Sequence, residues 1–158
     1  MKLLFICTHN RCRSILAEAL VRHISDGTII AKSAGSSPQG EVHPLTLKYL
    51  TEHKISTDGL RSRSWHQFED YNPDVILTLC DSAAQETCPV WFEPSVQVHW
   101  ALSDPSKKAV NEDRQRALFD ATISILERRI QALLGADQAS LTGDALPSTL
   151  NQIAAQID

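Results

Sequence analysis

Residues 7–14 of the chain read Cys-Thr-His-Asn-Arg-Cys-Arg-Ser, and they follow directly on the apolar run Leu3–Ile6. The run is typical of a buried strand, and the apolar spacing of residues 14–25 predicts a helix. These eight residues, the anion loop, are therefore expected to join a strand to a helix N-terminus. Such a loop directs several backbone N–H groups at one point, where the helix dipole adds positive potential. The sequence predicts that an oxyanion binds there.

Two side chains of the loop carry chemistry. Arg13 can donate two parallel hydrogen bonds to a tetrahedral anion. Cys7 stands where the same field stabilises a thiolate, and the hydroxyl of Ser14 is expected to lower its pKa further. The alternative is a buried cysteine beside a solvated arginine, which the position of the loop after a strand disfavours. The loop residues expected to bind the oxyanion are Thr8, His9, Asn10, Arg11, Cys12, Arg13 and Ser14.

The composition is that of an ordinary globular domain. The chain has 158 residues, of which 42% are hydrophobic and 22% charged, so we expect one domain with a sizeable core. A formal net charge of −4 argues against a general nucleic-acid binder. The apolar start is too short for a signal peptide, and no run reaches the length of a membrane span. We therefore expect a cytoplasmic protein with no membrane partner, whose four cysteines are reduced at rest.

Apolar runs and helical patterns alternate along the chain, which predicts a parallel sheet covered on both faces. The composition changes after Gly135, so a domain over 1–135 and a C-terminal tail over 136–158 are expected, with a short helix starting at Pro147 and no role assigned to the tail. The predicted strands cover residues 2–7, 28–33, 74–79 and 96–100, and the main predicted helices cover 14–25, 44–53 and 111–134.

A second group of residues follows the third and fourth predicted strands. Cys80 ends one strand, and Cys88 comes after seven residues without strong helical or strand character. The two cysteines can pair if that segment bends, or both can be small buried hydrophobes; a reactive Cys7 at a neighbouring strand end favours pairing. Asp104 precedes Pro105 in a loop after the fourth strand, where a carboxylic acid could protonate a leaving oxygen. Taken alone, that Asp-Pro pair indicates only a turn.

Together these segments resemble the arsenate reductases that share the low-molecular-weight protein tyrosine phosphatase fold and are coupled to thioredoxin. Tyrosine phosphatases of this fold share the first loop and the Asp-Pro pair, but they carry Pro and Tyr where this chain has Ile15 and Ser106. They also lack the second cysteine pair. The resemblance runs from about residue 3 to 134 and rests on the anion loop, Ser33–Gly35, the helix from Pro44, Thr78–Cys80, Cys88-Pro89 and His99–Pro105.

The resemblance implies a three-layer αβα sandwich with a four-stranded parallel sheet. It implies that arsenate is reduced through a covalent adduct and a disulfide relay, with no bound cofactor and with electrons from an external thiol reductant. Thioredoxin is the reductant implied, and glutaredoxin stays open. A phosphomonoesterase is the alternative function, because the anion loop and one acid suffice for hydrolysis. The implied catalytic residues are Cys7, Arg13, Cys80, Cys88 and Asp104.

Three points stay open at this stage. Cys12 either forms a protective disulfide with Cys7 or packs, and packing is the preferred interpretation. Some members of the family that this chain resembles bind a potassium ion near the loop through an Asn, a Glu, a Ser and an Asp. Asn10, Glu18 and Ser33 could be the first three of these ligands, but the sequence offers no secure aspartate, so no metal site is predicted. A zinc- or arsenite-binding module is disfavoured, because Cys-x-His-x2-Cys spacing is poor for zinc and the arginines repel cations.

Overall fold

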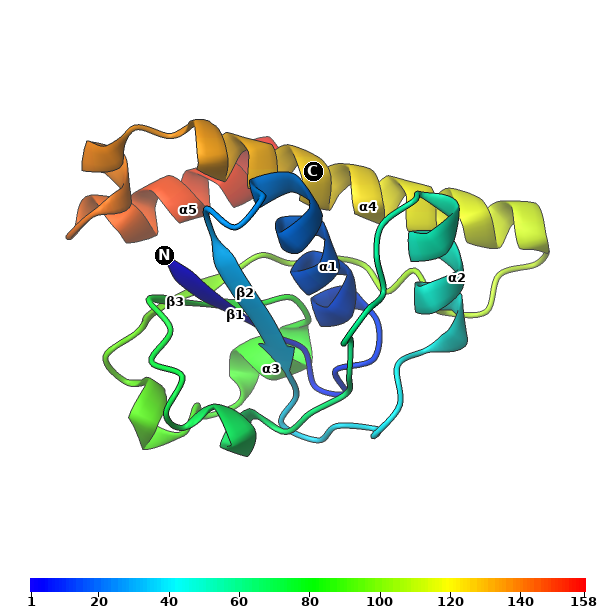
Figure 1. Ribbon diagram of the computed structural model, residues 1–158, viewed down its shortest axis with the longest axis horizontal. Coiled ribbons are helices and arrows are strands. Elements are labelled where there is room, and N and C mark those ends of the chain that lie inside the picture. Colours follow the sequence, from blue (N-terminus) through cyan, green and yellow to red (C-terminus); the bar gives the residue numbers. More distant parts are fainter.

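The computed structural model describes all residues 1–158 and contains one sheet of four parallel strands. The strands lie in the order β2-β1-β3-β4, so β1 and β3 are the central pair. Their bounds are Lys2–Ile6 for β1, Ile30–Ala34 for β2, Val75–Thr78 for β3 and Val96–His99 for β4. The α-helices are α1 (Arg13–Ser25), α2 (Pro44–Glu52), α3 (Asp81–Gln85), α4 (Glu112–Gly135) and α5 (Ala145–Gln156) (Figure 1). Short 3-10 helices cover Trp65–Phe68, Val90–Phe92 and Gln138–Leu141.

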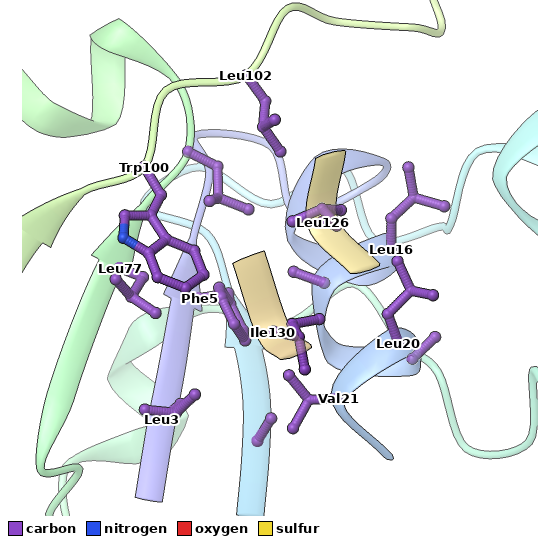
Figure 2. Packing of buried hydrophobic residues seen from close by; sticks show 14 of the residues in the cluster. Leu3, Phe5, Leu16, Leu20, Val21, Leu77, Trp100, Leu102, Leu126 and Ile130 are labelled. Atoms are coloured by element: carbon purple, nitrogen blue, oxygen red, sulfur yellow. The ribbon is translucent and has the colours of Figure 1, made fainter. Parts of the chain in front are cut away.

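The sheet is buried on both faces, which explains why residues 3–6 of β1 are all apolar. Leu3 and Phe5 belong to the larger core, shared with α1, α4 and α5, whereas Leu4 and Ile6 belong to the smaller one. Figure 2 shows the larger core, with Phe5 of β1 close to Ile130 of α4. The predicted three-layer αβα arrangement is confirmed; α3 and two 3-10 helices supply residues to the smaller core.

The C-terminal segment packs on the domain. Leu146, Leu150 and Ile153 of α5 are buried in the larger core, and Trp100 Nε1 donates a hydrogen bond to the Leu150 carbonyl at 2.9 Å. The predicted final helix exists, but it begins at Ala145. A proline two residues further on still lies in the first helical turn, where its missing N–H costs nothing. No helix of the structure combines the length and apolar composition that a membrane crossing requires.

The strand order places the ends of β1 and β3 side by side. The chain leaves β1 towards β2 on one side, and β3 and β4 lie on the other, so a crevice is expected between β1 and β3 at their carboxyl ends. Ile6 pairs with Thr78, and the N–H of Leu79 donates to the Ile6 carbonyl at 2.9 Å. The segment after β3 differs from the sequence expectation, because residues 81–85 form the short helix α3. Two consecutive alanines favour that helix.

Candidate active site

Six consecutive backbone N–H groups of the anion loop have no protein acceptor. The N–H groups of residues 9–14 donate to no backbone or side-chain oxygen. Carbonyl groups of the loop are held from outside instead: those of Thr8 and His9 accept from Ser37 and Gln39 at 2.9 and 3.1 Å. Buried N–H groups without partners are costly in proteins, and at a helix N-terminus they bind anions. The free N–H groups therefore fit the predicted cradle, and the binding of an oxyanion by them stays a prediction.

Asn10 fixes the shape of the loop. Its backbone is left-handed, with φ of 45°, a conformation that asparagine tolerates better than most residues. The fully buried side chain donates to Ser14 Oγ at 2.8 Å and accepts from the backbone N–H of Arg63 at 2.7 Å. Since Ser14 Oγ accepts this bond, its own hydrogen stays available. Sequence reasoning placed Asn10 in the cradle but did not foresee that it braces the loop.

Cys7 and Cys80 lie together at the crevice between β1 and β3. Both side chains belong to the smaller core, and each shifts the pKa of the other. Cys80 Sγ accepts from the N–H groups of Thr8 and Ala83, both at 3.4 Å, and contacts Thr8 Oγ1 at 3.5 Å. The neighbouring Cys7, followed by these donors, lowers the pKa of Cys80 to about 4, whereas the neighbouring Cys80 and burial raise the pKa of Cys7. The sequence did not lead us to expect a lowered pKa at Cys80, and a nucleophilic thiolate at Cys7 stays a prediction.

Arg13 and Asp104 line a small pocket at the mouth of the cradle. The pocket has a volume of about 70 Å³, about twice the share of one water molecule in the liquid, which suits a single tetrahedral oxyanion. Arg13 Nη1 donates to the Leu102 carbonyl at 3.0 Å. A larger groove of about 680 Å³ begins at the same two residues and runs along α4. The pocket is lined by Cys7, His9, Arg11, Cys12, Arg13, Asp104 and Ser106.

Asp104 is held by the residue two positions further on. Its Oδ1 accepts from the N–H and the hydroxyl of Ser106, at 2.9 and 2.6 Å. Although burial opposes ionisation, these bonds and the charge of Arg13 lower the pKa of Asp104. An oxyanion in the pocket would place negative charge beside this carboxylate and raise its pKa again. The sequence pointed to Asp104 but not to Ser106, although an Asp two residues before a Ser is a known turn signal.

The other two cysteines have different environments. Burial raises the pKa of Cys12 to about 12, and its side chain belongs to the larger core, as expected for a packing role. Cys88 is half-buried, and burial together with the charge of Glu86 raises its pKa. It lines a cavity of about 150 Å³ beside Thr78 and His99. Cys88 therefore lies near the smaller core, separated from Cys80 by α3.

The buried carboxylate of Glu18 links helix α1 to strand β2 and to Arg63. Glu18 of α1 is fully buried and accepts from Ser33 Oγ at 2.5 Å. Ser33 donates to Oε2, whereas Arg22 pairs with Oε1 and Arg63 Nη2 lies 3.6 Å from the same Oε1. These two guanidinium groups balance the buried charge, so the carboxylate needs no metal ion for neutrality. No set of three or more histidine, cysteine or carboxylate side chains has a metal-binding arrangement.

Comparison with known proteins agrees with this geometry. The model of the low molecular weight phosphotyrosine protein phosphatase family matches residues 2–145. The chain belongs to this family. The match extends past the limit of 134 that the sequence resemblance suggested, and it includes the anion loop, both members of the Cys80–Cys88 pair and Asp104.

Several proteins named arsenate reductases are similar to this chain in sequence or in structure. The arsenate reductase of Halalkalibacterium halodurans is 30% identical over 127 residues, 80% of this chain and 90% of that protein. The glutaredoxin arsenate reductase of Synechocystis sp. is 28% identical over 109 residues, covering 69% and 82%. The thioredoxin-dependent arsenate reductase of Corynebacterium glutamicum has a similar solved structure, with a TM-score of 0.65, 27% identity, and coverage of 88% of this chain and 62% of that one.

Proposed function

We propose that this protein reduces arsenate to arsenite through Cys7, Cys80 and Cys88, with Arg13 and Asp104 assisting the first step. The observation that carries the proposal is the burial of Cys7 and Cys80 together in the smaller core, where Cys80 Sγ accepts from the N–H of Thr8, the residue after Cys7. Hydrolysis of a phosphoester needs the loop but has no use for a second sulfur beside the nucleophile. The names of the relatives support reduction, and the buried thiol pair supports a relay.

In the first step, the oxyanion takes hydrogen bonds from the loop and from Arg13. The N–H of Thr8 turns from Cys80 to the anion, which removes a donor from the Cys80 thiolate and raises its pKa. The proton of Cys7 then passes to Cys80, and the Cys7 thiolate attacks arsenic. A sulfur–arsenic bond forms, one arsenic–oxygen bond breaks, and the departing hydroxide takes a proton from Asp104 to leave as water.

In the second step, Cys80 attacks the sulfur of Cys7. The sulfur–sulfur bond forms, and the sulfur–arsenic bond breaks with its electron pair staying on arsenic, which is thereby reduced from the pentavalent to the trivalent state. The Cys80 proton goes to an arsenite oxygen. Cys88 then attacks Cys80, so that a Cys80–Cys88 disulfide forms and Cys7 leaves as the free thiol. A dithiol reductant of the thioredoxin class returns two electrons, and the Synechocystis relative keeps glutaredoxin as the alternative donor.

The catalytic unit proposed here spans residues 1–135, with 136–158 as a C-terminal segment that completes the larger core through α5. We place the reaction in the cytoplasm, where thiol reductants keep cysteines reduced. Neither a nucleic acid nor a membrane is needed as a partner, and no bound cofactor takes part because sulfur carries both electrons.

Arsenate-dependent oxidation of NADPH, coupled through thioredoxin and thioredoxin reductase, tests the proposal. The wild-type protein should turn over, Cys80→Ser should be inactive, and Cys88→Ser should complete one round without recycling. If NADPH is not consumed, glutathione with glutaredoxin replaces the thioredoxin pair. Absence of turnover in both systems, together with hydrolysis of p-nitrophenyl phosphate that neither substitution changes, would make the protein a phosphomonoesterase.

A further inference from the structure

Two acidic side chains fasten the segment between Cys80 and Cys88 to the rest of the site. Asp81 Oδ1 lies 3.1 Å from His99 Nε2, but the Asp81 side chain is 86% exposed, so this pair is screened by water. Glu86 is half-buried, and its Oε1 accepts a hydrogen bond from Thr8 Oγ1 at 3.3 Å. The stronger of the two attachments therefore lies at the far end of α3.

The position of Glu86 fixes how far α3 can move. Glu86 is the C-cap of α3, and its own backbone is already extended, with φ of −78° and ψ of 145°. A disulfide requires its two Cα atoms to lie within about 7 Å. Since a helix followed by extended chain separates Cys80 from Cys88, we expect α3 to unwind before the two sulfurs bond. The contact between Glu86 and Thr8 opposes that unwinding.

The same contact puts a carboxylate at the rim of a site built for anions. Thr8 is the second residue of the anion loop, next to the nucleophile. An oxyanion held by the loop would face the negative charge of Glu86 across a partly buried region, where like charges repel more strongly than in water. Thr8 also changes partner, because its N–H turns to the oxyanion in the proposed reaction. An oxyanion in the loop therefore weakens the hydrogen bond between Thr8 and Glu86 in two ways, because it repels the Glu86 carboxylate and because it reorients Thr8.

We propose that Glu86 is a latch, which holds α3 against Thr8 in the resting enzyme and opens when an oxyanion occupies the anion loop. This inference rests on the proposed function, because a latch on α3 matters only if Cys88 has to reach Cys80. The latch keeps Cys80 and Cys88 apart until arsenate has bound. A disulfide between them at an earlier stage would remove the thiol that must attack Cys7. Glu86 is therefore a positioning residue, and it touches neither substrate nor the reacting atoms.

Hydrogen exchange of the amides of residues 81–88 in the reduced protein tests the latch without turnover. Adding inorganic phosphate, a tetrahedral oxyanion that cannot be reduced, should accelerate exchange in the wild type. Glu86→Ala, which removes the acceptor of the Thr8 hydroxyl, should exchange about fivefold faster without phosphate, the ratio expected for loss of one ordinary hydrogen bond, and phosphate should add little. Glu93→Ala is the matched control, since Glu93 is also acidic, is exposed and lies outside residues 81–88; it should behave as the wild type.

Isothermal titration calorimetry of the same proteins with phosphate separates the latch from the proposed function. Phosphate should bind if the loop takes oxyanions, and lack of binding would count against the proposed function. The latch is overturned if Glu86→Ala exchanges its 81–88 amides at the wild-type rate, whether or not phosphate binds. It is also overturned if phosphate binds the wild type and leaves exchange of the segment unchanged.

Discussion

Substitution of Gly35 by alanine tests how the end of β2 supports the anion loop. A methyl group on Gly35 would lie 2.6 Å from the carbonyl oxygen of Thr8, 2.9 Å from that of Cys7 and 3.0 Å from Asn10 Cβ. Ordinary contacts of such a carbon begin at 3.4 Å, so the methyl and the Thr8 oxygen must separate by roughly 0.8 Å. The atoms that the methyl group meets belong mostly to the loop backbone.

Neither side of this contact can retreat easily. The N–H of Gly35 donates to the Arg63 carbonyl at 2.9 Å, and its own carbonyl accepts from Trp65 at 3.0 Å. The Thr8 oxygen in turn accepts from the N–H of Ser37 at 2.9 Å. We therefore expect the loop to be pushed towards the pocket at the expense of one of these bonds.

The cost can be estimated from overpacking. Inserting a methyl group into a closely packed region destabilises a protein by about 1–3 kcal/mol. In a chain of this size each kcal/mol lowers Tm by about 2–4 °C, so Gly35→Ala should lower Tm by roughly 5 °C. Because a displacement of about 1 Å at a reacting centre can cost about 100-fold in rate, the loss of activity should exceed the loss of stability.

Thermal denaturation and arsenate-dependent NADPH oxidation measure the two effects. Gly135→Ala is the matched control, since a methyl group there meets no atom within 4 Å and the backbone is helical. The control should keep wild-type activity and have an unchanged or slightly higher Tm, because alanine favours a helix over glycine. A Gly35→Ala variant that matches Gly135→Ala in both measurements would refute this account of the loop.

Three further predictions concern other parts of the molecule. Leu150→Ala should destabilise the protein by about 2–5 kcal/mol in urea denaturation, because this fully buried residue of α5 completes the larger core. The control Gln152→Ala, at an exposed position of the same helix, should change stability little. Equal effects of the two substitutions would mean that α5 does not pack on the domain. Cys80 has a pKa of about 4, so ultraviolet thiolate absorbance should persist as the pH falls through 7 and disappear only near 4, and iodoacetamide should label Cys80 in mild acid. A thiolate absorbance that disappears at pH 7 or above would contradict the lowered pKa of Cys80. Asp104→Asn should lower kcat by about 100- to 10,000-fold with a smaller change in KM, as expected for loss of a general acid, and an unchanged kcat would remove Asp104 from the mechanism.

The periodic elements were predictable because their causes are local. The apolar strand 2–7 and the helix over 14–25 differ from β1 and α1 by one residue at an end, and the helix from Pro44 begins where a proline suits the first turn. The adjacency of Cys7 and Cys80 also followed from sequence, because parallel strands end at one edge of the sheet. Such inferences need only spacing and topology.

The rest depends on contacts between distant residues. The lowered pKa of Cys80 could not be foreseen, because Cys7 and the donors Thr8 and Ala83 surround that sulfur only in the folded chain. No periodicity could reveal that Arg63 would approach the buried carboxylate of Glu18, 45 residues earlier in the sequence. The segment 81–85 was expected to lack regular structure, and it forms a helix too short for its pattern to be recognised.

Disulfide mapping after a single round with arsenate tests the three-cysteine relay most directly. The reduced Cys88→Ser protein is mixed with arsenate without a reductant, free thiols are alkylated, and the peptides are identified by mass spectrometry. The account predicts a disulfide between Cys7 and Cys80, with one arsenite released per protein, whereas the wild type ends with a Cys80–Cys88 disulfide. A Cys7–Cys12 disulfide in either protein, or arsenite release with all thiols still free, would contradict it.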